Sequence, residues 1–326
     1  MNELKPRDII WSGVGVLVLG GLFVMHNTSV PPASAKVSEI RSFLHQSIES
    51  LGPEQSYLQL KRAYAKESGT TKHLITHLFG EELYILVGLE GVQACDESFG
   101  FGCFHGFFIK AVTTEGLAVV LPLDEVCRDT YPKGHLSCQH GIAHGILEYL
   151  GHDRLEEAFS VCRTIPDLKP IGGCLSGVFM EYNVPLAISD EGLFTAAPRP
   201  FNPETPYDPC PLLSKDIQPA CFHELPQWWH ETFGSDFSRP GALCNAIVEV
   251  EHKNACFSGL GSTVPLFSSF DVLAIQEACD QMPTEATVVI CLQRAAWALR
   301  GYDDLEGARE LCSDLTPKER MQCPSH

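Results

Sequence analysis

The cysteines of this chain recur with a regular spacing that restricts the folds open to it. There are fourteen, and none lies in the first 94 residues. They fall into seven successive pairs: Cys95 with Cys103, Cys127 with Cys138, Cys162 with Cys174, Cys210 with Cys221, Cys244 with Cys256, Cys279 with Cys291, and Cys312 with Cys323. From Cys103 to Cys291 the second members recur every 35 or 36 residues, except for a gap of 47 between Cys174 and Cys221. Such a period is typical of helical-hairpin repeats.

One unit explains why each pair should form a disulfide. In residues 153–162 (DRLEEAFSVC) the apolar positions have helical spacing, and the prolines and glycines of TIPDLKPIGG then end the helix. Cys174 opens a second apolar segment, CLSGVFMEY. One cysteine therefore ends a helix and the next begins its antiparallel partner, which places the two within reach of a disulfide. The sequence predicts an all-α chain, an α-solenoid of antiparallel hairpins that are each stapled by a disulfide.

The cysteine spacing also indicates the compartment. No CxxC or CxxCH motif is present, so neither zinc-ribbon spacing nor a haem attachment site is available. Seven disulfides are typical of proteins outside the reducing cytoplasm.

The N-terminus agrees with export. Residues 9–25 (IIWSGVGVLVLGGLFVM) carry no charge and follow Lys5 and Arg7, which predicts a single-pass signal anchor with residues 1–8 in the cytoplasm and the bulk of the chain periplasmic or on the cell surface. The alternative is a signal peptide cleaved near Ala33-Ser34-Ala35, which would release a secreted protein. A linker (26–36), two or three N-terminal helices (37–94) and the cysteine-paired repeats (95–323) follow. The proline-rich excursion 183–220 is either an ordered lid or a mobile surface loop.

Histidines gather in the first repeats. His73 and His77, and likewise His140 and His144, are four residues apart and so share a helix face. His105 follows Cys103 by two residues, as His140 follows Cys138, so stacked repeats should bring their side chains together.

Glu181 belongs to the next helix of the stack. We therefore expect a metal site of His73, His77, His105, His140, His144 and Glu181. Its imidazole and carboxylate ligands suit a transition metal, with zinc as the default.

A structural interpretation stands beside the metal site. Gly106, Gly141, Gly145, Gly177 and Gly259 would let helices approach closely, and the repeated histidines would then be packing residues. The remaining histidines, His45, His152, His230, His252 and His326, are expected at the surface or in packing roles. Trp228 and Trp229 are expected to fill the core between repeats.

The 35-residue period with one disulfide per hairpin resembles secreted helical-repeat proteins of the Sel1/TPR type over residues 95 to 323, although the units lack the Ala-Leu-Gly-Tyr signature of Sel1 repeats. The segment CQHGIAHG, followed by LEEAFSVC and CLSGVFMEY, is similar to a Cys/His-Gly pattern of exported bacterial proteins. The resemblance implies a scaffold with a concave binding surface and no particular reaction.

Two functions therefore remain open. The first is a membrane-anchored, extracytoplasmic scaffold that binds a protein or a glycan. The alternative is a metal-dependent enzyme or a metal-sequestering protein that uses the histidine cluster. A formal net charge of −18 argues against nucleic acid as a partner, since phosphate binding needs Lys and Arg.

Overall fold

The computed structural model describes residues 29–132, 134–189, 192–196, 198–234, 236–313 and 315–324. The predicted cytoplasmic segment 1–8 and the predicted anchor 9–25 lie outside them. Within the described ranges, no helix is both long enough and apolar enough to cross a membrane.

The chain begins with helices that carry no cysteine. Helix α1 (Val37–Leu51) ends at Gly52, and Pro53 starts α2 (Pro53–Ala63), as the Gly-Pro break predicts. Apolar side chains of α1, among them Ile40 and Leu44, are buried, and α1 packs against α3 (Gly69–Val87). A 3-10 helix, η1 (Leu89–Ala94), leads to the first cysteine.

The remaining chain alternates long helices, which have 14 to 18 residues apart from α8 with 10, with others of 3 to 11 residues. The long ones are α4 (Gly102–Glu115), α6 (His135–Leu150), α8 (Cys174–Asn183), α9 (Gln218–Phe233), α11 (Val250–Phe267) and α13 (Glu285–Gly301). The shorter ones between and after them are η2 (Leu117–Val119), α5 (Val120–Thr130), α7 (Leu155–Cys162), η3 (Cys210–Leu212), α10 (Ser238–Ala246), α12 (Val272–Cys279), α14 (Leu305–Ser313) and α15 (Pro317–Arg320). The helical class predicted from the sequence is confirmed.

All seven predicted disulfides are present, and no cysteine is free. The bonds join Cys95 to Cys103, Cys127 to Cys138, Cys162 to Cys174, Cys210 to Cys221, Cys244 to Cys256, Cys279 to Cys291, and Cys312 to Cys323. In the unit used above, Cys162 is the last residue of α7 and Cys174 the first of α8. The prediction that each cysteine pair bridges its own turn is therefore confirmed.

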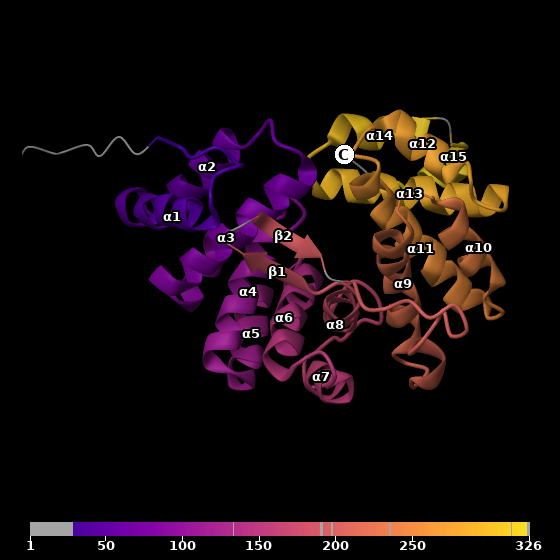
Figure 1. Cartoon of the computed structure of the whole chain (residues 1–326), viewed down its shortest axis with the longest axis horizontal. Helices are drawn as coiled ribbons and strands as arrows, with labels where there is room; N and C mark the ends of the chain where they lie inside the picture. Colours follow the sequence, from indigo (N-terminus) through magenta and orange to yellow (C-terminus); the bar gives the residue numbers. More distant parts are fainter. Residues whose placement is uncertain are drawn as a thin grey trace, which may run out of the picture.

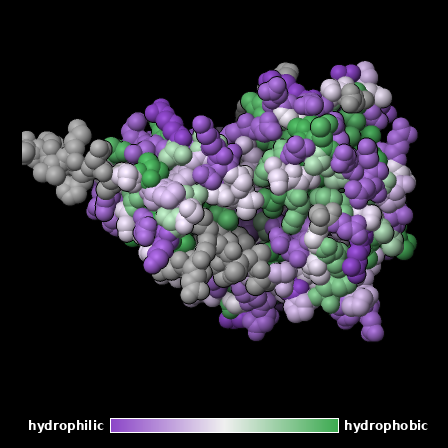
Figure 2. All heavy atoms as spheres, turned by 45° about the horizontal axis from the view of Figure 1, so that its top comes forward, coloured by the Kyte–Doolittle hydropathy of each residue, from purple (hydrophilic) through white to green (hydrophobic). Residues whose placement is uncertain are grey.

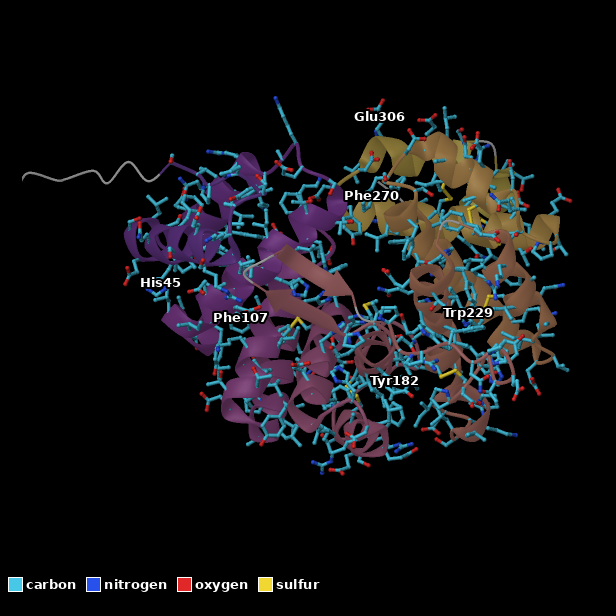
Figure 3. The ribbon with its side chains drawn as sticks, in the orientation of Figure 1. His45, Phe107, Tyr182, Trp229, Phe270 and Glu306 are labelled. Atoms are coloured by element: carbon cyan, nitrogen blue, oxygen red, sulfur yellow. A yellow bond between two sulfur atoms is a disulfide. The ribbon has the colours of Figure 1, made fainter. Side chains whose placement is uncertain are left out.

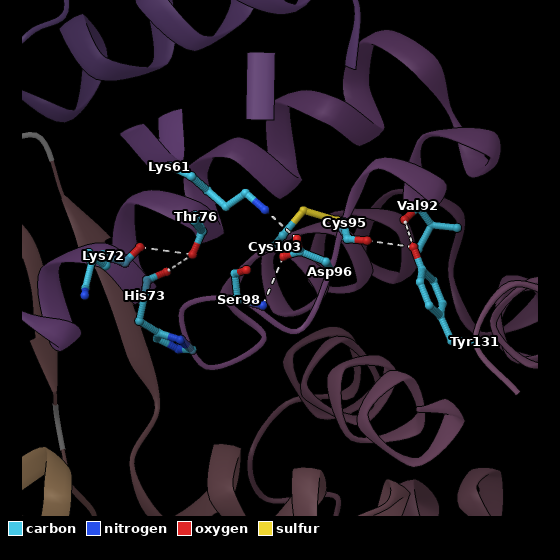
Figure 4. The surroundings of a disulfide bond; sticks show 10 residues. All are labelled: Lys61, Lys72, His73, Thr76, Val92, Cys95, Asp96, Ser98, Cys103 and Tyr131. Carbon is cyan, nitrogen blue, oxygen red and sulfur yellow. Dashed lines mark hydrogen bonds and ion pairs between the residues drawn. A yellow bond between two sulfur atoms is a disulfide. The ribbon is translucent and has the colours of Figure 1, made fainter. Parts of the chain in front are cut away.

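The first disulfide, between Cys95 and Cys103, is shown in Figure 4. Beside it, the Tyr131 hydroxyl donates to the carbonyl oxygens of Val92 and Cys95. The turn that leads into α4 is thus held by a covalent bond and by hydrogen bonds.

The long helices form a ring (Figure 1). Each of α3, α4, α6, α8, α9, α11 and α13 contacts the next. The two ends of the row also meet, because the Gly100 amide donates to the Gly301 carbonyl at 2.9 Å and Gly301 ends α13. The Tyr302 ring packs on Phe270, 4.6 Å between centroids, at the same junction. The hairpins therefore close on themselves, and an open solenoid, in which the ends of the row stay apart, is not confirmed.

The excursion between α8 and α9 contains two short antiparallel strands, β1 (Leu186–Ser189) and β2 (Gly192–Ala196). Strand β2 contacts α3 across the ring, and Figure 1 shows the strands in front of the long helices. Arg199, in the excursion, also contacts the helices on either side of it. Its Nε atom donates to the side chain of Asn183 at the end of α8, and its guanidinium stacks over the ring of Trp228 on α9. The excursion thus lies over one face of the ring.

Aromatic side chains fill the space between the hairpins. Trp228 and Trp229 are fully buried, as predicted, and their indole N–H groups donate to the Arg199 and Pro206 carbonyls. Trp229 lies within the C-terminal half of the ring and Phe107 within the N-terminal half (Figure 3). On the face that Figure 2 shows, hydrophilic side chains are interspersed with hydrophobic ones.

Candidate metal centre

Five histidines from three consecutive helices of the ring lie together. His73 and His77 come from α3, His105 from α4, and His140 and His144 from α6. Helix α4 packs between the other two. The sequence prediction that these side chains converge is therefore met by their positions.

Glycines hold these helices at short distance. A Cβ atom on Gly106 would lie 1.9 Å from the His77 carbonyl oxygen, and one on Gly177 would lie 2.2 Å from the His140 oxygen. The Cys-x-His-Gly sequence at residues 103–106 of α4 thus does two things at once. Its glycine lets the backbone approach the histidine of the preceding helix, and its own histidine then faces the same cluster.

The first half of the cluster consists of His73, His77 and His105. The Nε2 atoms of His73 and His77 are 3.1 Å apart, and the His105 ring lies 5.2 and 5.3 Å from these two rings, between centroids. One nitrogen from each of the three rings lies within 4.8 Å of the others. The Nδ1 atom of His73 is 2.9 Å from the Phe99 carbonyl and so carries the ring proton as a donor. That hydrogen bond leaves the His73 Nε2 lone pair facing the cluster.

The second half consists of His105, His140 and His144, again with one nitrogen each within 4.8 Å. The His144 Nδ1 atom is 2.8 Å from the Glu181 Oε2 atom and donates to it. The other ring nitrogen of His144 is buried and has no hydrogen-bond partner among the described residues. Glu181 therefore orients His144. With Glu148 and His152 it also forms a third group of possible ligand atoms within 4.8 Å of one another, so its predicted ligand role stays a prediction.

The imidazoles of His73, His77, His105 and His140 are neutral at ordinary pH. Burial lowers the pKa of His73 to about 4 and that of His140 to about 3, and it lowers the pKa values of His77 and His105 well below the usual 6.5. Neighbouring histidines lower the pKa values of His77 and His105 further. Neutral imidazole is the form that binds metal ions, so the site presents several lone pairs without first losing protons.

Glu181 has a second partner that sequence analysis missed. The His152 Nε2 atom is 3.1 Å from Glu181 Oε1, and His152 had been placed with the surface or packing histidines. Burial raises the pKa of Glu181, but its hydrogen bonds from His144 and His152 outweigh this and lower the pKa overall. Glu181 is therefore a carboxylate anion. His152 lies in the turn after α6, and this turn brings it to Glu181 on α8. No helical or repeat spacing in the sequence predicts that contact.

A second pair of a histidine and a glutamate lies on α9. The His223 Nδ1 atom is 2.8 Å from Glu224 Oε1, and Glu224 also interacts electrostatically with His140. Burial raises the pKa of Glu224, but His223 and His140 together bring it below its usual value. His223 follows Cys221 by two residues, the same position that His105 and His140 hold after their cysteines, and this is the sequence signal for the pair. No sequence pattern predicted a role for Glu224.

The cluster opens onto a cavity at the centre of the ring. The cavity has a volume of about 670 Å³, and all seven ring helices contribute to its lining. His73, His105, His140 and His144 line it on one side, and α9, α11 and α13 supply the opposite wall. No lysine or arginine is among the described residues that line it. The volume suits a small organic molecule.

The other histidines lie apart from this cluster. His230 packs between Phe237 and Phe267, His252 stacks on Phe222, and His45 lies beside Glu82. Their predicted packing and surface roles hold. His326 lies outside the described residues.

Comparison of the chain with protein-family models, with curated proteins and with solved structures gives no match. The resemblance to Sel1/TPR-type repeats therefore stays a prediction, and function must be argued from the site.

Proposed function

We propose that this protein binds a transition-metal ion, zinc by default, through its histidine cluster and uses the ion on a small molecule held in the ring cavity. The observation that carries the proposal is the convergence of five imidazoles from three helices, four of which line the cavity. The proposal is thus a metal-dependent enzyme.

Packing alone is a poor reason for such a cluster. A buried polar atom without a hydrogen bond costs about 1–3 kcal/mol, and the Nε2 atom of His144 is in that position. A neutral imidazole offers one donor and one acceptor, and the Nδ1 atom of His144 donates to Glu181, so its Nε2 atom is an acceptor that no described residue satisfies. A cation bound at that acceptor removes the cost.

The ligand set and its surroundings fit a catalytic ion. Imidazole nitrogen suits zinc, copper, iron and nickel. Three histidines with an open position facing a cavity are the ligand number of catalytic zinc, where the ion polarises a bound carbonyl or activates a bound water. The charged Glu181 behind His144 is the outer carboxylate that metal-bound histidines commonly have.

Other predictions about the whole chain remain proposals. Seven disulfides support a location outside the cytoplasm, and the apolar run 9–25 supports a single-pass anchor or a cleaved signal. A scaffold for a protein or glycan would need the open concave face of a solenoid. The closed ring favours a small molecule over such a partner.

The test is the metal content of the natively purified, untagged full chain, measured by plasma mass spectrometry. It is compared with a His140→Ala, His144→Ala double variant and with His135→Ala, a histidine on the same helix outside the cluster. At least one equivalent is expected in the wild type and the control, and less metal is expected in a folded double variant. A folded wild type without metal, even after zinc, copper or iron is added, would refute the proposal.

A further inference from the structure

We infer that the histidine cluster holds two metal ions, one in each group of three imidazoles, and that the two ions share His105. This inference rests on the proposed function and adds the number of ions and the bridge. The first group is His73, His77 and His105, and the second is His105, His140 and His144.

The cluster is arranged in two similar halves about His105. Each half has a pair of histidines four residues apart on one helix, His73 and His77 on α3, and His140 and His144 on α6. Helix α4, which carries His105, packs against both. The His105 ring is about equally far from its neighbours, 5.2 Å from His73 and 4.9 Å from His144, between centroids.

Each half also has its own orienting hydrogen bond. In the first, the Phe99 carbonyl accepts from His73 Nδ1; in the second, the Glu181 carboxylate accepts from His144 Nδ1. Each bond fixes the tautomer of one histidine and turns its Nε2 lone pair inward. A single metal site would need only one histidine oriented in this way. The protein has two, oriented by acceptors on separate parts of the chain, Phe99 and Glu181.

One ion cannot use all five rings. With metal–nitrogen bonds of about 2.0–2.1 Å, two ligands of one ion lie at most about 4.2 Å apart. The nitrogens approach within 4.8 Å in two separate groups of three, and these groups do not merge into one. The 3.1 Å between His73 Nε2 and His77 Nε2 is close to the roughly 3.3 Å between two ligands of a tetrahedral ion.

His105 can serve both ions because imidazole has a nitrogen on each edge of the ring. When both nitrogens bind metal, the ring loses its remaining proton to solvent and becomes an imidazolate. No electrons are transferred in this step, and two divalent cations offset the new negative charge. The two ions would then lie on opposite sides of the His105 ring.

Copper(II) is the probe, because its unpaired electron reports the bridge. The metal-free, untagged full chain is titrated with Cu²⁺, and bound copper and the paramagnetic resonance signal are measured together. Two equivalents should bind, and the second should reduce the integrated signal per copper through coupling across His105. His77→Gln and His144→Gln should each bind one equivalent with full signal. His135→Gln, the matched control, should behave as the wild type.

The outcomes separate the two proposals. One equivalent in the wild type would overturn the two-ion inference and leave the proposed function standing. Two equivalents with uncoupled spectra would overturn the shared His105. No binding by a folded chain would overturn the proposed function itself. Because the two glutamine variants each keep one complete group, the test stands even if a His105 variant fails to fold.

Discussion

Glu181 and His144 form a buried hydrogen-bonded pair, with Glu181 Oε2 accepting from His144 Nδ1 at 2.8 Å. Both side chains are almost fully buried, and they come from adjacent ring helices, α6 and α8. The bond keeps the proton on Nδ1 and directs Nε2 into the cluster. A carboxylate in this position also makes the imidazole a stronger ligand.

Glu181→Gln should weaken metal binding by about 10- to 100-fold without changing the number of ions bound, because the amide keeps the shape but loses the charge. Competition with a chromophoric chelator measures the affinity. Glu125→Gln is the control, since Glu125 is an exposed carboxylate on α5 that belongs to none of the groups of possible metal ligands. Equal affinities for Glu181→Gln and wild type would mean that the carboxylate has no part in metal binding.

Gly106→Ala should destabilise the fold by about 3 kcal/mol, because its Cβ would lie 1.9 Å from a backbone oxygen that cannot rotate away. Helices α3 and α4 must move apart to admit the methyl group. Urea unfolding at equilibrium gives the change in free energy.

Gly301→Ala is the matched control, because the nearest atom to its Cβ would be 3.8 Å away, an ordinary contact. A change within about 1 kcal/mol is expected there. If Gly106→Ala were as stable as this control, close helix approach would not be the reason for glycine at that position.

The disulfide between Cys162 and Cys174 should contribute about 3 kcal/mol, because its partners are 12 residues apart and the closed loop restricts the unfolded chain. A Cys162→Ala, Cys174→Ala double variant, unfolded in urea beside the wild type, measures this. Reducing agent should then lower the stability of the wild type further than that of the double variant, since the double variant has one disulfide fewer to lose. A double variant as stable as the wild type would contradict this estimate.

The repeat explains how much of this fold was available from sequence. The cysteine period predicted every disulfide, from the first pair to Cys312 with Cys323, because each pair reports a contact between residues near in sequence. Ring closure was not available, because it depends on the small rotation between successive hairpins, which no spacing encodes. The contact between Gly100 and Gly301 joins residues some 200 positions apart.

The candidate site, like the fold, was predicted only in part from the sequence. His105 and His140 were predicted to be neighbours because they hold equivalent repeat positions. Glu181 was associated with the site as a ligand, but its hydrogen bond to His144 Nδ1 was not predicted, since spacing gives proximity and not the atom that a side chain faces. His152 and Glu224 were missed because neither occupies a repeated histidine position.

His230 should make the stability of the protein fall in mild acid. Burial between two phenylalanines lowers its pKa to about 4, whereas the unfolded chain has a histidine pKa near 6.5. Between these two values the unfolded state binds more protons, so the free energy of unfolding decreases as pH falls from 6.5 toward 4. Well above pH 6.5 neither state binds the proton, and the effect disappears. At pH 5 the cost from this one residue is about 2 kcal/mol.

The measurement is urea unfolding of metal-free protein at pH 8 and pH 5. The drop in stability should be about 2 kcal/mol smaller in His230→Leu than in the wild type, because leucine fills the site and binds no proton. His135→Leu, which removes a partly exposed histidine from the start of α6, should keep the wild-type drop. The other buried histidines act equally in all three proteins, so the difference isolates His230. An identical drop in His230→Leu would mean that this histidine is protonated in the folded state as readily as in the unfolded one.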